Sequence, residues 1–128
     1  EYEILWSLVG SEMCIRDSHW NRNMSFVVAI RIQLEGDAEI FREMIMQYRE
    51  DCLANESGME QFLICSIPDD EKGFLLFEVF SDQEAHQLHS QGSDLQKLLQ
   101  SMQEQNMRME VMMMGGEEIE SETQPILN

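Results

Sequence analysis

Two histidines and one glutamate are the side chains of this chain that are best suited to moving protons. His86 and His89 are three residues apart, so they share one face if the segment is helical. Glu78 is the one charged residue in the apolar run FLLFEVF. Neutral imidazole can take a proton and return it near neutral pH, and burial raises the pKa of a carboxyl group towards the same range. We therefore predict His89 and Glu78 as catalytic residues, with His89 as a proton shuttle and Glu78 as an acid, a base or a group that orients the histidine.

Each of these residues also has a structural interpretation. His89 can be a histidine at a helix C-terminus that the helix dipole stabilises, and Glu78 can be a structural carboxylate paired with Arg31 or another base. Two histidines and one carboxylate are also a conceivable metal site, but their spacing is loose for one. The methionines between Met102 and Met114 lack the spacing of a thioether copper site, so we interpret them as packing residues. We predict no metal and no cofactor.

The spacing of apolar residues indicates the elements that position these side chains. Runs rich in β-branched and aromatic residues predict strands, and apolar residues at spacings of three and four predict helices. Asp37 and a capping box from Ser81 to Glu84 mark two helix starts, and Gly58 suits a left-handed turn after the first helix. The predicted strands are 25–32, 61–67, 74–80 and 108–114, with a polar hairpin loop at 68–73 and helices from Asp37 to about Asn55, from Ser81 through His89 to near Gly92, and after Asp94.

This order predicts an α+β fold of the ferredoxin-like β-α-β-β-α-β type, an antiparallel sheet with its helices on one face. The first three predicted strands are apolar on both faces. Helices on one face cannot cover the other, which would leave an apolar patch larger than soluble monomers usually expose. A second copy, packed sheet against sheet, is the simplest cover, so we predict a homodimer of the dimeric α+β barrel type.

The charge balance argues against several partners. The chain has 25 Asp and Glu residues against 8 Lys and Arg, for a net charge of −17. Such a charge repels phosphate backbones and anionic lipid headgroups, so we predict no nucleic acid and no membrane as partner. No run of about 18 apolar residues is present to span a bilayer. The cysteines Cys14, Cys52 and Cys65 show no metal-ligand spacing and suit a reducing compartment, so we predict a cytoplasmic protein.

The first residues have the character of a foreign sequence. Residues 7–17 read SLVGSEMCIRD, which looks like a translated transposase adapter from shotgun sequencing libraries. A signal peptide is the competing interpretation, but the segment has no basic stretch at its start and its apolar run is short. We predict that residues 1–23 are a non-native, disordered artefact segment and that the natural chain starts at Met24. Residues 24–114 then form one domain, and residues 115–128 form an acidic, disordered tail.

The central stretch also carries a set of residues in a recognisable order. These are Glu56-Ser57-Gly58 with Phe62 four residues on, Phe77-Glu78-Val79-Phe80, Ala85 with His89 four residues on, and then Leu95 and Leu98. In order and spacing they resemble the antibiotic biosynthesis monooxygenase family of dimeric α+β barrels, over about residues 26–114. The resemblance implies the same ferredoxin-like fold and the same dimer. Members of this family include cofactor-free oxygenases that oxidise polycyclic phenols to quinones.

The resemblance therefore implies a substrate and a pocket. We expect a cofactor-independent monooxygenase that oxidises a hydroquinone or polyphenol with molecular oxygen. The small apolar or aromatic substrate would lie in an apolar pocket between helices and sheet, beside the proton shuttle His89. We expect His86, Tyr48, Phe62 and Phe77 to line this pocket.

Departures from the family pattern leave two alternatives open. The family helix often continues from its histidine into a Ser/Thr-Pro-His-aromatic turn, whereas this chain has Gly92-Ser93-Asp94-Leu95. Residues 24–128 contain no tryptophan, which disfavours the haem-degrading branch, and few basic residues, which disfavours a phosphorylated substrate. The alternatives are a non-catalytic dimeric barrel that binds a small ligand and a small-molecule isomerase of the same family.

Overall fold

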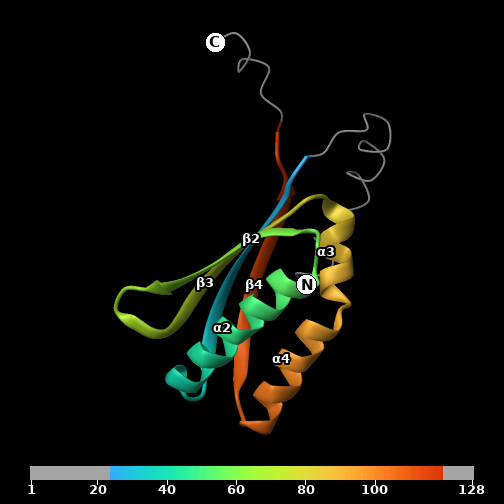
Figure 1. Ribbon diagram of the computed structural model, residues 1–128. Coiled ribbons are helices and arrows are strands. Elements are labelled where there is room, and N and C mark those ends of the chain that lie inside the picture. The colour runs from blue at the N-terminus through green and yellow to red at the C-terminus, as the bar shows by residue number, and fades with distance from the viewer. Residues whose placement is uncertain (1–23, 120–128) are drawn as a thin grey trace.

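Seven helices and strands follow one another along residues 24–119, the part of the chain that the structure, a computed structural model, describes (Figure 1). In order they are β1 (Phe26–Glu35), α2 (Ala38–Asn55), β2 (Met59–Ile67), β3 (Asp70–Phe80), α3 (Gln83–Ser90), α4 (Ser93–Glu104) and β4 (Arg108–Glu117). The predicted artefact segment 1–23 and residues 120–128 of the predicted tail lie outside the described residues. No helix in the described range is both long and apolar enough to cross a membrane.

The strands form one four-stranded antiparallel sheet in the order β2-β3-β1-β4. Strands β3 and β1 are therefore central. Glu78 of β3 lies opposite Val28 of β1 and Phe62 of β2, so this carboxylate projects from the middle of the sheet. The predicted α+β, ferredoxin-like fold is confirmed, with the second helical segment divided into α3 and α4 at Gly92.

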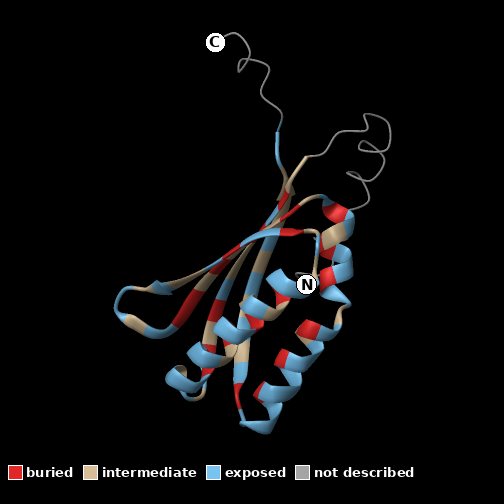
Figure 2. Ribbon diagram, in the orientation of Figure 1, coloured by how far each residue is buried: buried red, intermediate tan, exposed pale blue. Residues whose placement is uncertain are grey.

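The helices cover one face of the sheet, and we call this face the inner face (Figures 1 and 2). Side chains alternate along a strand, and on β1 and β3 those that point to the helices are buried, except for the half-buried Ile30. These buried residues are Phe26, Val28, Ile32 and Leu34 of β1 and Phe74, Leu76, Glu78 and Phe80 of β3. From α2 the stripe Phe41, Ile45, Tyr48 and Cys52 packs against them.

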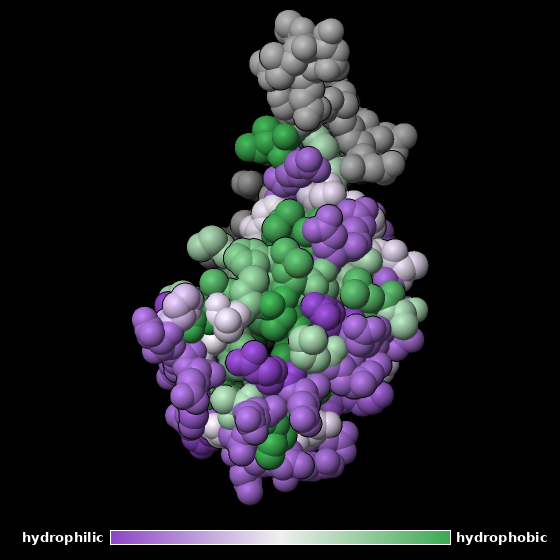
Figure 3. All heavy atoms as spheres, turned by 60° about the vertical axis from the view of Figure 1, so that its left-hand side comes forward, coloured by the Kyte–Doolittle hydropathy of each residue, from purple (hydrophilic) through white to green (hydrophobic). Residues whose placement is uncertain are grey.

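The opposite face, the outer face, has no helix over it within the described residues. It carries Val27, Ala29 and Arg31 of β1, Leu63 and Cys65 of β2, Leu75, Phe77 and Val79 of β3, and Met112 and Met114 of β4. Several of these apolar side chains are more than half exposed, among them Leu63 at 53%, Met112 at 61% and Met114 at 68%. Figure 3 looks at the molecule from the side of the β2–β3 hairpin and shows hydrophobic side chains gathered in the middle of that view between hydrophilic margins.

Some predicted boundaries were wrong. Strand β1 runs on to Glu35, and β4 runs on to Glu117, because the two strands pair along their whole length. Pairing between β2 and β3 reduces the predicted six-residue loop to a turn at Pro68-Asp69. The cap of α3 is Asp82, whose carboxylate accepts a 2.8 Å hydrogen bond from the Ala85 amide, and not Ser81.

The turn between α2 and β2 differs from expectation in a way that bears on function. Gly58 does not adopt a left-handed conformation, and Gly36 is the one described glycine with positive φ. A Cβ atom on Gly58 would lie 2.5 Å from the Cβ of Ala85 on α3. The glycine is therefore required because the turn packs directly against α3. This packing brings Glu56, two residues before Gly58, close to the C-terminal end of that helix.

Candidate active site

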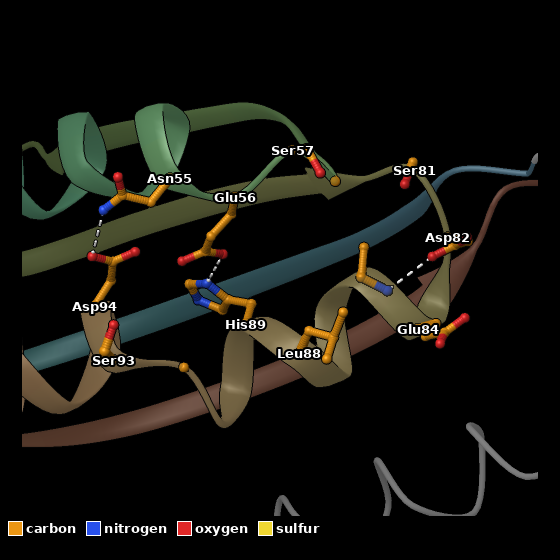
Figure 4. Close-up of a pocket in the computed structure, with 13 residues that line it drawn as sticks. Asn55, Glu56, Ser57, Ser81, Asp82, Glu84, Leu88, His89, Ser93 and Asp94 are labelled. Carbon is orange, nitrogen blue, oxygen red and sulfur yellow. Dashed lines mark hydrogen bonds and ion pairs between the residues drawn. The ribbon is translucent and has the colours of Figure 1, made fainter.

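The imidazole of His89 lies at the centre of a buried hydrogen-bond network. His89 is in the last turn of α3 and is 5% exposed. Its Nδ1 lies 2.7 Å from Oε1 of Glu56, at the end of α2 (Figure 4). Its Nε2 lies 3.0 Å from the hydroxyl oxygen of Tyr48 and 3.8 Å from Oε1 of Glu78. Three elements, α2, β3 and α3, thus bring their polar groups to one ring.

The hydrogen-bond partners of His89 determine which atoms of this network carry protons. A carboxylate only accepts hydrogen bonds, so Nδ1 of His89 donates to Glu56. In the neutral ring Nε2 is then an acceptor, and the Tyr48 hydroxyl donates to it. Burial, with the charge of Glu78 as a smaller cause, raises the pKa of Tyr48 far above its ordinary value, so the hydroxyl keeps its proton. The result is a chain of donors that runs from Tyr48 through His89 to Glu56.

Glu78 is poised to change its charge near neutral pH. It is 2% exposed, and this burial raises the pKa of its carboxyl group from 4.5 to about 7. The nearby His89 acts in the opposite direction and Glu56 in the same direction, but loss of hydration is the largest of the three effects. The alternative in which Glu78 pairs with Arg31 is wrong, because Arg31 is an exposed residue of the outer face.

Cys52 completes the wall of the network. Its thiol is fully buried, and its Sγ lies within 4.8 Å of a carboxylate oxygen of Glu56 and of a ring nitrogen of His89. Burial raises the pKa of this thiol well above its ordinary value, so it remains protonated. Phe62 lies beside Tyr48, with ring centroids 5.7 Å apart and an edge-to-face arrangement. These contacts fix the tyrosine ring in the rotamer that places its hydroxyl on His89.

His86 lies next to the network but has a different environment. Its ring is packed between Phe26 and Phe80, at centroid distances of 5.7 Å and 5.0 Å. Burial, and then the neighbouring His89, lower the pKa of His86 to about 3. His86 is therefore neutral across the physiological pH range.

A groove opens beside His89, on the helical side of the molecule. It has a volume of about 470 Å³ and lies between the α2–β2 turn, residues 55–58, and the α3–α4 segment (Figure 4). Glu56 and His89 both line it, whereas Tyr48 and Glu78 do not. Asn55 donates a 3.0 Å hydrogen bond to Asp94 of α4, which holds one end of the groove together.

Most of the predicted site residues are brought together, and one is not. The side chains of Glu78 and Phe62 project from the inner face of the sheet, and those of Tyr48 and His89 meet them from α2 and α3. His86 packs beside His89. Phe77 lies on the outer face, because it precedes Glu78 by one position in a strand, so it does not line the same space.

Sequence reasoning missed Glu56 and Cys52 as members of the site. A signal for Glu56 was present, since it opens the Glu-x-Gly pattern beside the α2–β2 turn. Cys52, Glu56 and His89 are also the described residues that could hold a metal ion, with one ligand atom from each lying within 4.8 Å of the others. This set differs from the His86, His89 and Glu78 set considered from the sequence. In the described structure His89 already hydrogen-bonds to Glu56 and to Tyr48.

Comparison with known proteins places this geometry in context. The model of the antibiotic biosynthesis monooxygenase family matches residues 25–101. No curated protein matches the chain. Among solved structures, the chain is similar to SnoaB, a cofactor-independent oxygenase from Streptomyces nogalater, with 12% identity and a TM-score of 0.60, covering 80% of this chain and 98% of that one.

Two further structures have the same fold. A conserved protein of unknown function from Bacteroides thetaiotaomicron is 14% identical, with a TM-score of 0.64, and 76% of this chain and 100% of that one are covered. A protein from Pseudomonas aeruginosa is also 14% identical, with a TM-score of 0.65, and 76% and 96% of the two chains are covered. At these identities the likeness concerns the fold.

Proposed function

Because this chain belongs to the antibiotic biosynthesis monooxygenase family, we propose that it is a cofactor-independent monooxygenase that oxidises an electron-rich phenol or hydroquinone with molecular oxygen. The observation that carries this proposal is the buried His89, held through Nδ1 by Glu56 and facing Tyr48 and Glu78 through Nε2. Such a network can hold a proton taken from a substrate, in surroundings that exclude water. The structural similarity to a cofactor-independent oxygenase is consistent with it.

The chemistry needs only the substrate and oxygen. Removal of the phenolic proton gives an anion that passes an electron to O₂, and the two radicals then combine at a ring carbon. For an anthrone-type substrate, a CH₂ group becomes C=O, one oxygen atom enters the product, and the other leaves as water. The substrate itself supplies all four electrons, so no external reductant is required. The task of the protein is to remove the first proton and to shield the anion.

Oxygen uptake tests this proposal. The full chain, stripped of metal, is mixed with a panel of hydroquinones and anthrones in an oxygen electrode, beside the His89→Gln variant. We expect uptake by the wild type and a loss of about 10²-fold or more in the variant, the usual contribution of proton transfer. Glu71→Gln, at an exposed position near the β2–β3 turn, is the matched control for surface substitution. Uptake that is equal in wild type and His89→Gln contradicts a role for the network.

One observation favours the alternative of a small-molecule isomerase. Tyr48 and Glu78 do not line the groove, and the groove lining is rich in polar residues such as Asn55 and Asp94. A proton relay beside a polar groove can move a proton within a substrate without oxygen. Exchange of substrate protons in D₂O under nitrogen distinguishes this reaction from oxygenation. Ligand binding without either signal supports the non-catalytic barrel.

We also propose that a second copy of the chain covers the outer face. The exposed apolar residues of that face come from β1, β2 and β4, and β3 adds the half-buried Leu75, Phe77 and Val79 between them. An apolar face of this kind is larger than a monomer usually leaves in water. Two copies packed face to face would bury the outer faces of both sheets, as in sheet-on-sheet packing.

We propose a reducing, cytoplasmic location for the protein, which fits the two free thiols of the described residues, Cys52 and Cys65.

A further inference from the structure

We infer that Glu56 is the group that meets the substrate: its carboxylate takes the proton of a phenolic hydroxyl bound in the groove, and His89 acts behind it as a positioning residue. This inference rests on the proposed function and changes the assignment of its base. It also defines the substrate class as uncharged or positively charged phenols. The catalytic residues predicted from the sequence were His89 and Glu78, and Glu56 was not among them.

Access is the first argument. The side chain of Glu56 is 20% exposed, whereas those of His89 and Glu78 are 5% and 2% exposed. Of the groups in the network, Glu56 and His89 border the groove. Nε2 of His89, the atom expected to act as a base, is turned into the protein and lies 3.0 Å from the Tyr48 hydroxyl. A molecule in the groove therefore reaches the Glu56 carboxylate before it reaches a basic nitrogen.

The second argument is the way in which Glu56 is held. The 2.7 Å bond from His89 Nδ1 to Oε1 fixes the carboxylate from one side, and the buried Cys52 thiol lies next to it, with one ligand atom of each of the three residues within 4.8 Å of the others. A carboxylate has about four lone-pair positions, so these neighbours leave room for a further donor at the groove. Gly58 and Ala85 pack the turn that carries Glu56 against α3, so the carboxylate and the imidazole keep a fixed separation.

The proton can be followed through the reaction. The O–H bond of the substrate breaks and an O–H bond forms on Glu56, which leaves the phenolate free to react with O₂. The two radicals combine at a ring carbon that still bears one hydrogen, and the peroxide formed there takes the proton held on Glu56, which restores the carboxylate. The C–H bond of that carbon and the O–O bond then break, the carbon becomes C=O, and the second proton leaves with the outer oxygen atom as water. A carboxylate can act as such a base where neighbouring donors stabilise the oxyanion. The hydroxyl groups of Ser57 and Ser93, which also line the groove, can provide those donors.

The charge of the groove limits the substrate. Besides Glu56, its described lining includes the acidic residues Asp82, Glu84 and Asp94, and it includes no lysine or arginine. A carboxylated or sulfonated phenol would be repelled, because no cation is present to pair with its anion. The site thus fits a neutral polyphenol or one that carries an amine.

The test compares two variants of Glu56 with wild type and with the surface control Glu71→Gln. Glu56→Gln keeps the shape and an acceptor oxygen for His89, and we expect its kcat for a neutral anthrone to fall about 10²-fold or more with little change in KM. Glu56→Ala leaves a space at the groove, and we expect added formate or acetate to restore its activity about tenfold, since a small carboxylate can replace a missing base. A merely structural role would give no such rescue. A sulfonated anthrone should be a poor substrate for the wild type.

Each failure is distinguishable. Wild type that consumes no oxygen with any substrate overturns the proposed function and this inference with it. The assignment of Glu56 alone is overturned if the wild type is active and Glu56→Gln, with an unchanged melting temperature, keeps more than half of the wild-type kcat. The same holds if Glu56→Ala is inactive and neither formate nor acetate rescues it while it remains folded. A preference for the sulfonated substrate overturns the substrate class.

Discussion

Replacement of Glu78 by glutamine should change how the stability of the protein depends on pH. Burial raises the pKa of this carboxyl group from 4.5 in an ordinary environment to about 7 in the folded protein. Below the ordinary value both states carry the proton, and the buried side chain is neutral. As pH rises through the folded-state value, the folded protein must hold a buried charge that the unfolded chain leaves in water. Stability is therefore lost as pH rises from about 4.5 to about 7.

The size of the effect follows from the pKa difference. A tenfold difference in proton affinity is worth about 1.4 kcal/mol, so the full effect is about 3 kcal/mol. Glutamine has nearly the same shape and no charge, so Glu78→Gln should behave like the protonated wild type at every pH. The variant should exceed the wild type in free energy of unfolding by about 1 kcal/mol near pH 5 and by about 3 kcal/mol near pH 8.5.

Urea unfolding followed by circular dichroism measures this difference directly. Protein concentration is held fixed, because a dimer would make stability concentration-dependent, and the series begins above the isoelectric point of about 4.2. Glu71→Gln is the control, and its difference from the wild type should stay flat. A flat difference for Glu78→Gln, or one that favours the wild type at high pH, would refute the reasoning. It would mean that attraction between Glu78 and His89, 3.8 Å apart, outweighs the loss of hydration.

Three further predictions concern the rest of the structure. Gly58→Ala should lower the free energy of unfolding by about 1–3 kcal/mol, because the new methyl group meets Ala85, and adding Ala85→Gly should recover part of the loss in the same urea assay. Met112→Glu on the outer face should shift the mass measured by light scattering from twice to once the 15.0 kDa of the chain, and an unchanged mass would argue against a dimer through this face. The ring signals of His86 should not move in an NMR titration down to about pH 4, since the pKa of this histidine is lowered to about 3, and movement near pH 6.5 would show that its ring is open to water.

Short sequence patterns correctly predicted the features that are determined by neighbouring residues in the chain. Helix α2 begins after Asp37, as expected, because the Asp37 carboxylate accepts hydrogen bonds from the amides of Glu39 and Ile40. The alternation along β3 correctly placed Glu78 on the buried face. In both cases neighbours in sequence determine the conformation.

Features that depend on distant partners could not be read in this way. Strand β4 reaches Glu117 because that residue pairs with Phe26, although methionine and glycine are weak strand formers. Phe77 adjoins Glu78 in sequence, and this adjacency puts it on the other face of the sheet, away from the pocket that it was predicted to line. The role of Glu56 depends on its bond to His89, 33 residues away, which no local pattern predicts.

The same separations have a consequence for the order in which the protein folds. The bond between Glu56 and His89 joins residues 33 positions apart, and the bond between Tyr48 and His89 joins residues 41 positions apart. Both close only when α3 has come to lie next to α2, and contacts across such long loops form slowly. Partly folded chains therefore lack the assembled site even where their helices and hairpin are complete. During refolding, recovery of the His89 ring environment should lag behind recovery of secondary structure. The site itself therefore reports when α3 has docked.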